Sequence, residues 1–431
     1  MKILETSLKN QQQMENQQNI NMLKKLLTFF YVGSFLIGIY SCKSEPIESV
    51  RLIDAPTLGI SSSEPSIFKS ENGMIYLSWI EKDRDTISHL KFSTLDNNKW
   101  STPKTITQGK DWFVNWADFP SMTSFGESNL VAHYLEKSAE DTYAYDVKLI
   151  QSTDNGETWS ENFKPHSDNT NTEHGFVSKM PLTENSYLTV WLDGRQNAYA
   201  ETDSTIQKQM TLRSAVINNN GELLQESLLD NRVCDCCQTD VAMTNEGPLV
   251  VYRNRSKDEI RDTYYVKHVN GKWTEPKPLY NDNWKISGCP VNGPSIAAKD
   301  NFVVATWFTA ADNLPKTKII FSSDNGNTFS RPITVAQETT MGRLDVEILD
   351  DGSAILSSMN SKEGESEILL HHINNNGNIS APFIVSQTAN SRSSGFPRMV
   401  IKNDHIYLAW TSVGETLEVQ TIQISVDALM K

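Results

Sequence analysis

The sequence predicts an all-β fold, a β-propeller of four-stranded blades with seven blades preferred over six. Three observations predict it: short apolar strands recur at a near-constant period, turn signals separate them, and no helical periodicity is sustained beyond residue 42. Radial repetition of small sheets protects most strand edges without covering helices. A chain of 431 residues is long enough for one closed domain of this kind.

The repeat is carried by an apolar strand that ends in an aromatic residue in six of its seven copies, 51 to 61 residues apart. The end positions are Trp79, Tyr134, Trp191, Tyr252, Trp307, Ser358 and Trp410. The last unit lacks a fourth strand of its own. We expect residues 50–53, which precede the first complete unit, to supply it and to close the ring.

The N-terminal segment has the pattern of a bacterial lipoprotein signal. A short basic region at 22–25 precedes an apolar run at 26–40, and Ser41 and Cys42 end it. The run is short for a membrane-spanning helix, although a retained anchor is the alternative. We therefore expect an extension and signal at 1–42, a linker at 43–49 and a single propeller at 50–431. Met22 is favoured over Met1 as the start, and Cys42 as the lipidated residue.

This pattern predicts a cell-envelope protein, held at the outer membrane or the periplasmic face through its lipid alone. The formal net charge of −14 argues against nucleic acid as a partner, because there is no basic stripe to displace counterions from phosphates. We expect a monomer.

Four cysteines remain after Cys42: Cys234, Cys236, Cys237 and Cys289. An even number in an oxidising compartment favours disulfides, between loops or as a strained vicinal pair at Cys236 and Cys237. A soft-metal site that adds Asp235 or His174 is the less favoured alternative, because C-x-C-C is not a standard zinc spacing. No other cofactor is expected.

Unusual polar clusters stand directly before the innermost strands of consecutive units, where the loops of a propeller converge on one mouth of its channel. They occupy 115–118, 172–175, 234–237, 289–292, 342–345 and 395–398. Recurrence at one register predicts a functional mouth.

Several side chains in or near these clusters suit the chemistry of an acidic sugar. Arg343 and Arg398 are two candidates for a carboxylate clamp, with Arg213, Arg253 or Arg261 as the third, because guanidinium pairs bidentately with carboxylate. The candidate acid/base groups are Asp118, Glu173 and Asp345. The candidate nucleophiles or proton-transfer groups are Tyr143 and Tyr145, and His133 and His174 are candidate bases for an elimination on a uronate-containing glycan.

Two turns carry a recognisable signature, S-T-D-N-G-E-T-W at 152–159 and S-S-D-N-G-N-T-F at 322–329. They resemble the Asp-boxes of sialidases and related BNR-repeat propellers. The stretches at 234–238 and 289–293 also resemble a bacterial group usually labelled sialidase-like. The first resemblance implies a propeller whose active site holds three arginines, a Tyr nucleophile with a Glu partner, and an Asp acid/base.

The sequence departs from that pattern on its first blade, where S-E-P-S-I at 63–67 holds no arginine. The leading hypothesis is a sialidase-like enzyme, a glycoside hydrolase whose partner is an acidic glycan. The alternatives are a propeller that binds glycan or protein without catalysis, and a metal or redox lipoprotein built on the cysteines.

Overall fold

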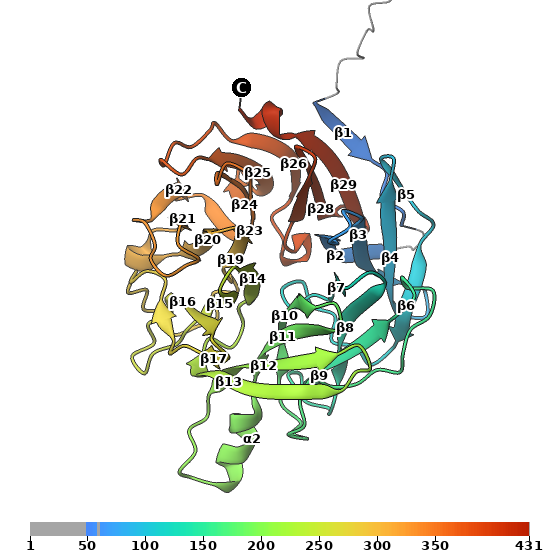
Figure 1. Ribbon diagram of the computed structural model, residues 1–431, viewed down its shortest axis with the longest axis vertical. Coiled ribbons are helices and arrows are strands. Elements are labelled where there is room, and N and C mark those ends of the chain that lie inside the picture. The colour runs from blue at the N-terminus through green and yellow to red at the C-terminus, as the bar shows by residue number, and fades with distance from the viewer. Residues whose placement is uncertain (1–48, 58–60, 431) are drawn as a thin grey trace, which may run out of the picture. The chain divides into compact units, whose positions relative to one another are not determined.

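The computed structural model describes residues 49–57 and 61–430. The predicted signal, Cys42 and most of the predicted linker lie outside the described residues. Residues Ser49–Lys431 form one compact unit, and its strands are arranged as seven antiparallel sheets in a ring around a central axis (Figure 1). The seven-bladed prediction is therefore confirmed over six.

Each of the first three blades begins with the strand that lies nearest the channel. Blade 1 contains β2 (Ser61–Lys69), β3 (Ile75–Lys82), β4 (Ser88–Asp96), β5 (Lys99–Trp100) and β6 (Lys104–Gly109). Blade 2 contains β7 (Ser121–Phe125), β8 (Asn129–Lys137) and β9 (Tyr145–Ser152), and Phe163 pairs with Leu149 at its outer edge. Blade 3 contains β10 (His174–Thr183), β11 (Ser186–Asp193), β12 (Met210–Asn218) and β13 (Leu223–Val233).

The next three blades follow the same order. Blade 4 contains β14 (Asp240–Thr244), β15 (Gly247–Arg253), β16 (Thr263–Val269), β17 (Lys272–Trp273) and β18 (Lys277–Pro278). Blade 5 contains β19 (Ser295–Lys299), β20 (Phe302–Thr309), β21 (Lys316–Ser322) and β22 (Ile333–Gln337). Blade 6 contains β23 (Thr340–Ile348), β24 (Ala354–Lys362), β25 (Glu365–Ile373) and β26 (Phe383–Ala389).

Blade 7 joins the two ends of the propeller. It contains β27 (Arg398–Lys402), β28 (His405–Val413) and β29 (Leu417–Ser425), and β1 (Val50–Ile53) is its outer strand. The pairing of β1 with β29 is antiparallel, with Val50 opposite Ile424. The predicted closure of the ring by residues 50–53 is confirmed.

The core is divided among the junctions between blades. Seven hydrophobic clusters lie there, one at each junction, and each draws its side chains from two adjacent blades. The aromatic residues that end the repeated strand belong to this packing: Trp79, Trp191 and Trp307 are almost completely buried. The period seen in the sequence therefore reflects one buried position per blade.

Helices play a small part in the described residues. One α-helix, α2 (Arg195–Thr202), interrupts blade 3 between β11 and β12 and projects from the ring (Figure 1). Three short 3-10 helices lie at Ala311–Asn313, Arg392–Ser394 and Val426–Leu429. No helix of the described chain is long and apolar enough to cross a membrane.

The two signature turns have the same internal hydrogen bonds. In the first, Asp154 Oδ1 accepts from Thr158 N at 2.9 Å and Ser152 Oγ accepts from Gly156 N at 2.8 Å. Asp324 and Ser322 repeat both bonds in the second turn. Gly156 has a φ of +81°, which a side chain would oppose. These turns stabilise blades 2 and 5 and do not contribute to the mouth.

Candidate functional site: a carboxyl–phenol triad and a thiol cluster at one mouth

The loops that enter the innermost strands do meet, as their shared register predicts. Gln238 connects two neighbours, since its Nε2 donates to Ala117 O at 2.6 Å and its Oε1 accepts from Gly293 N at 2.8 Å. Asn292 Oδ1 accepts from Arg343 N at 2.8 Å, and Arg343 Nη1 donates to Gly395 O at 3.1 Å. Blades that are far apart in the sequence therefore share one loop network.

Backbone strain occurs at this same register, as it does at several turns elsewhere in the described chain. Glu64, Phe176, Val291 and Arg343 all have φ between +48° and +55°. Such values are uncommon for residues other than glycine and rare for a β-branched residue. Three of the four lie in irregular stretches of pairing in β2, β10 and β23. Strain of about 1–3 kcal/mol per residue persists where the surrounding structure imposes it, and it is concentrated at functional sites.

Three of the sequence candidates form a hydrogen-bonded triad at the mouth. Tyr145 Oη lies 2.7 Å from Glu173 Oε1 and 3.2 Å from Asp118 Oδ2. Residues 145 and 173 are adjacent through a parallel bridge between the start of β9 and the loop before β10. Gly175 permits the approach of Asp118, because a Cβ on residue 175 would lie 2.0 Å from Asp118 Oδ2.

The environment keeps protons on this triad near neutral pH. Burial raises the pKa of Asp118 to about 7, although the N–H of Phe176 and the hydroxyl of Tyr145 act to lower it. Burial also raises the pKa of Glu173 to about 8, aided by the nearby charge of Asp118. Burial raises the pKa of Tyr145 well above its ordinary value. Titratable groups whose pKa values are moved towards neutrality suit acid/base chemistry.

The hydrogen bonds assign a direction to the triad. A phenol has one proton, and the shorter bond places that proton towards Glu173. The contact with Asp118 is then satisfied only when Asp118 is protonated and donates to the phenol oxygen. An ionised Glu173 and a protonated Asp118 therefore fulfil both contacts at once.

A cavity of about 160 Å³ lies in the channel, lined by the innermost strands. Asp118 lines it, and so do Lys179, Asp240 and Arg398. Lys179 and Asp240 were not among the sequence candidates. The inward alternation of their strands was the signal that could have found them.

The predicted three-arginine clamp is not formed. Arg398 pairs with Asp345 at 3.1 Å in the channel. Arg343 is buried, its guanidinium carbon lies 4.9 Å from the centre of the Trp116 ring, and burial lowers its pKa to about 10. The three candidates for the third arginine lie elsewhere. Arg213 pairs with Glu226 in blade 3, Arg253 donates to backbone carbonyls, and Arg261 contacts Cys234.

Asp345 has a structural role that its sequence position did not reveal. Its Oδ2 accepts from Met399 N on the next blade at 2.7 Å. Asp118 and Asp240 make the same kind of contact, to Phe176 N at 2.6 Å and to Ile296 N at 2.9 Å. Carboxylates thus connect the innermost strands of blades 2 and 3, 4 and 5, and 6 and 7.

The two candidate histidine bases lie away from the triad. His174 is fully buried, and burial would lower its pKa, but the bond to Asp168 and the nearby Asp193 raise it instead. His133 accepts from Lys179 Nζ at 2.6 Å, and burial lowers its pKa well below the usual range. The other tyrosine candidate, Tyr143, is 60% exposed on a loop. The His174 ring contacts Tyr145 only at its backbone carbonyl, with Nδ1 3.4 Å from the oxygen, and not at its hydroxyl.

The buried cluster around His174 has the composition of a metal site but not its geometry. His166 Nε2 and His174 Nδ1 each lie 3.7 Å from Asp146 Oδ1. The two imidazole rings stack with centroids 3.9 Å apart and planes inclined by 5°. A metal ion lies in the plane of each imidazole that binds it, and two stacked parallel rings share no such point. The cluster lies between β9 of blade 2, which carries Asp146, and β10 of blade 3, which begins at His174.

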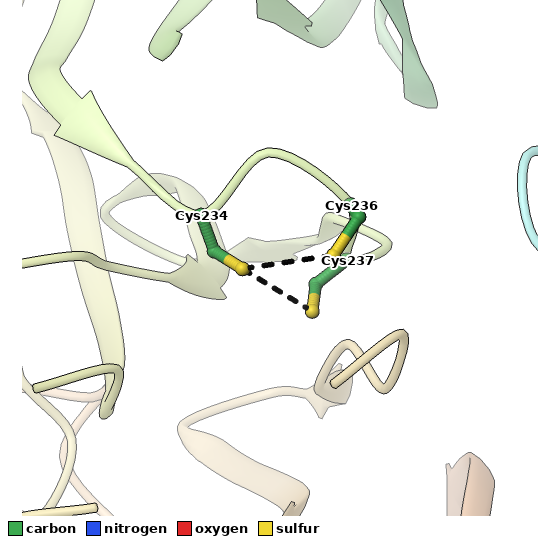
Figure 2. Close-up of side chains that lie close together, drawn as sticks. All are labelled: Cys234, Cys236 and Cys237. Carbon is green, nitrogen blue, oxygen red and sulfur yellow. Dashed lines mark hydrogen bonds between the residues drawn. The ribbon is translucent and has the colours of Figure 1, made fainter. Parts of the chain in front are cut away.

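The four thiols lie together beside the triad. Cys234 Sγ is 3.9 Å from Cys236 Sγ and 3.7 Å from Cys237 Sγ, and the three sulfur atoms point toward one another (Figure 2). Cys236 also contacts Cys289, and the charge of Cys289 acts on Glu173. All four are free thiols in the structure, so the expected disulfides are not formed there.

Several solved structures are similar to this chain, and three of them are described next. One is a protein of unknown function from Dyadobacter fermentans, with 13% identity, a TM-score of 0.49, and coverage of 88% of this chain and 100% of that one. NanB sialidase from Streptococcus pneumoniae has 14% identity, a TM-score of 0.45, and coverage of 88% and 71%. The α-L-arabinofuranosidase Arb93A from Fusarium graminearum has 11% identity, a TM-score of 0.46, and coverage of 88% and 98%.

No protein-family model matches the chain, and no curated protein matches it. Two of these three structures are named as glycan-degrading enzymes. Their sequence identities and TM-scores are too low to indicate the chemistry of the mouth in this chain.

Proposed function

We propose that this protein is a glycoside hydrolase that cleaves an acidic glycan at the mouth of the propeller. The observation that carries the proposal is the phenol of Tyr145 held between two carboxyl groups whose pKa values are raised towards neutrality. A phenol with a carboxylate partner, and a second carboxyl group within reach, are the groups that the Asp-box resemblance implied.

The proposed roles follow from the direction of the hydrogen bonds. Glu173 accepts the proton of Tyr145 as the phenol oxygen attacks the anomeric carbon of the sugar. Asp118 gives its proton to the oxygen of the leaving group, and a glycosyl–tyrosine forms. In the second step Asp118 takes a proton from water, the water oxygen displaces the phenol, and the phenol recovers its proton from Glu173.

The preference for an acidic substrate rests on the cationic groups near the triad. Arg398 lines the cavity beside Asp118, where Asp345 pairs with it, and burial lowers the pKa of Lys179, which also lines the cavity, well below its usual value. Arg343 donates to the carbonyl oxygens of Gly395 and Ser391, and no carboxylate is among its partners in the described part of the chain. A buried guanidinium without a counter-ion favours an anionic ligand.

The experiment is a screen of the purified full chain against a panel of sialylated and uronate-containing glycans, with products measured by mass spectrometry. For at least one glycan we expect two products whose masses sum to that of the substrate plus one water, and the loss of both products in Glu173→Gln. Unsaturated products would indicate elimination and contradict hydrolysis.

A second candidate, glycan binding without catalysis, is favoured by the absence of the arginine clamp. Arg213, Arg253 and Arg261 are each engaged by other groups of the protein. Binding of a glycan by the wild-type chain with no cleavage in the same screen would support this candidate over the first.

We further propose that the chain is anchored at the cell envelope through a lipid on Cys42, which lies outside the described residues. The basic, apolar and cysteine pattern at 22–42 supports the proposal. Metabolic labelling with a fatty acid in a bacterial host tests it, with Cys42→Ser expected to lose the label. A labelled Cys42→Ser chain would contradict it.

A further inference from the structure

The separations between the sulfur atoms of the thiol cluster fit a shared metal ion and not a disulfide. The distances from Cys234 Sγ are 3.7 and 3.9 Å. A disulfide requires about 2.05 Å between its sulfur atoms. Thiolates bound at about 2.3 Å to one tetrahedral ion lie about 3.8 Å apart. Two of the three separations therefore match ligands around a common centre, and all three sulfur atoms lie within 4.8 Å of one another.

The loop that carries the three cysteines is held by hydrogen bonds to three other segments of the chain. Cys234 follows β13 directly, and its N donates to Arg253 O at 2.9 Å. Cys236 and Cys237 precede Gln238, whose side chain is bonded to Ala117 O and Gly293 N. Cys234 and Cys237 are buried and Cys236 is half-buried, so the sulfur atoms meet in a site that is largely shielded from water.

The surroundings favour negative charge on sulfur. Arg261 Nη1 donates to Cys234 Sγ at 3.2 Å. Thiolate is the form of cysteine that binds metal ions. The guanidinium also offsets part of the charge that several thiolates leave around a monovalent or divalent ion.

The ligand set selects the class of metal. Three thiols meet here with no imidazole, since His174 faces Asp168 and Asp193 instead. Sulfur ligands select soft d¹⁰ ions such as Cu⁺ and Zn²⁺ over hard oxygen-seeking cations. Cys289 is exposed and contacts Cys236, so it is the candidate for a fourth ligand.

We propose that Cys234, Cys236 and Cys237 form a thiolate site for one soft d¹⁰ cation, Cu⁺ or Zn²⁺, with Cys289 as its exposed fourth ligand. The site is distinct from the triad and separate from the proposed hydrolysis. It opens towards the same mouth, because Cys289 is exposed on the loop before β19 and Glu173 stands directly before β10.

The test is anaerobic titration of the reduced full chain with Zn²⁺ and, separately, with Cu⁺ held in a chelator buffer. We expect one ion per chain and sulfur neighbours at about 2.3 Å by X-ray absorption. Cys236→Ser should weaken binding by at least about 100-fold and Cys289→Ser by about 10-fold. Loss of a contact that only supports a ligand costs about 10- to 100-fold in metal affinity, and loss of a ligand costs at least as much. The number of sulfur neighbours distinguishes a three-sulfur site from a four-sulfur site that includes Cys289.

The matched control is Cys42→Ser, which removes the one remaining cysteine and should leave the stoichiometry at one. Thermal melting of each apo variant shows that it is folded, and the Tm of the wild type should rise on metal addition while that of Cys236→Ser does not. Unchanged binding by folded Cys236→Ser would overturn the proposal. So would a Cys236–Cys237 or Cys234–Cys237 disulfide in protein isolated without reductant.

Discussion

Asp118 of blade 2 accepts a hydrogen bond from the backbone N–H of Phe176 in blade 3 through one carboxyl oxygen and contacts Tyr145 through the other. One side chain therefore connects two blades and completes the triad. Phe176 has a φ of +55°, so its N–H is presented to Asp118 by strained backbone. The position of the triad depends directly on the junction between these blades.

The first prediction concerns pH. The two carboxyl groups act as a pair, with pKa values raised to about 7 and about 8. Below about 7 both carry protons, and above about 8 both are ionised. Between these values the pair holds one proton, and because the pKa of Glu173 is the higher, the form with that proton on Asp118, which the mechanism requires, is the minor one of the two. We expect kcat/KM on any glycan found in the screen to peak between these values. A profile that is flat from pH 5 to 9 would contradict the assignment, and Asp118→Asn should abolish the peak.

The second prediction concerns the junction of blades 6 and 7. Asp345→Ala removes the partner of Arg398 and the acceptor for Met399 N. We expect a loss of about 3 kcal/mol in the free energy of unfolding, because the variant leaves a charge in the channel without its partner. Asp350→Ala is the control, since the side chain of Asp350 is 93% exposed beside Lys299 and should cost less than about 1 kcal/mol. Equal losses in urea unfolding would refute the structural role of Asp345.

The third prediction concerns closure of the ring. Ile53 is 5% exposed and its carbonyl accepts from Thr421 Oγ1, whereas the adjacent Leu52 is 69% exposed. Ile53→Asp should cost about 3 kcal/mol by placing a charge in the core, and Leu52→Asp should stay within about 0.5 kcal/mol. Thermal melting of both variants decides, and a similar Tm for the two would show that β1 does not stabilise blade 7.

The fourth prediction concerns strain at the mouth. Val291 has a φ of +48°, a conformation that asparagine adopts more readily than a β-branched residue. Val291→Asn should therefore stabilise the fold by about 1 kcal/mol. Val177→Asn, at a half-buried position of β10 without positive φ, should destabilise it. If both substitutions destabilise the fold to the same extent, relief of the backbone strain at Val291 does not stabilise the protein.

The fold was predictable because its determinants are local and repeated. The buried aromatic at the end of each second strand recurs once per blade, and the incomplete last unit together with residues 50–53 indicated the closure. The helix α2 was missed because its sequence shows no amphipathic periodicity, and its one buried residue is Arg195. Arg195 is retained there by ion pairs with Asp193 and Glu226.

The site was predictable only as a set of loops. Asp118, Glu173 and the cysteines were expected at one mouth because they all stand directly before innermost strands. That shared position gave no information on the direction of their side chains. His174 lies one residue after Glu173 and faces into blade 3, because alternate residues of a strand point to opposite sides. Asp345 and Arg398 pair with each other across two blades, a contact that no sequence spacing indicates.

The kcat of Tyr145→Phe on a cleaved glycan tests most directly whether the triad performs catalysis. The matched control is Tyr252→Phe, since Tyr252 is an equally buried tyrosine that donates to Asp230 at 2.7 Å away from the triad. We expect Tyr145→Phe to retain its fold and its kcat to fall by at least about 100-fold. In the control, kcat should change by less than about 2-fold. A Tyr145→Phe enzyme with wild-type kcat would contradict catalysis by the triad.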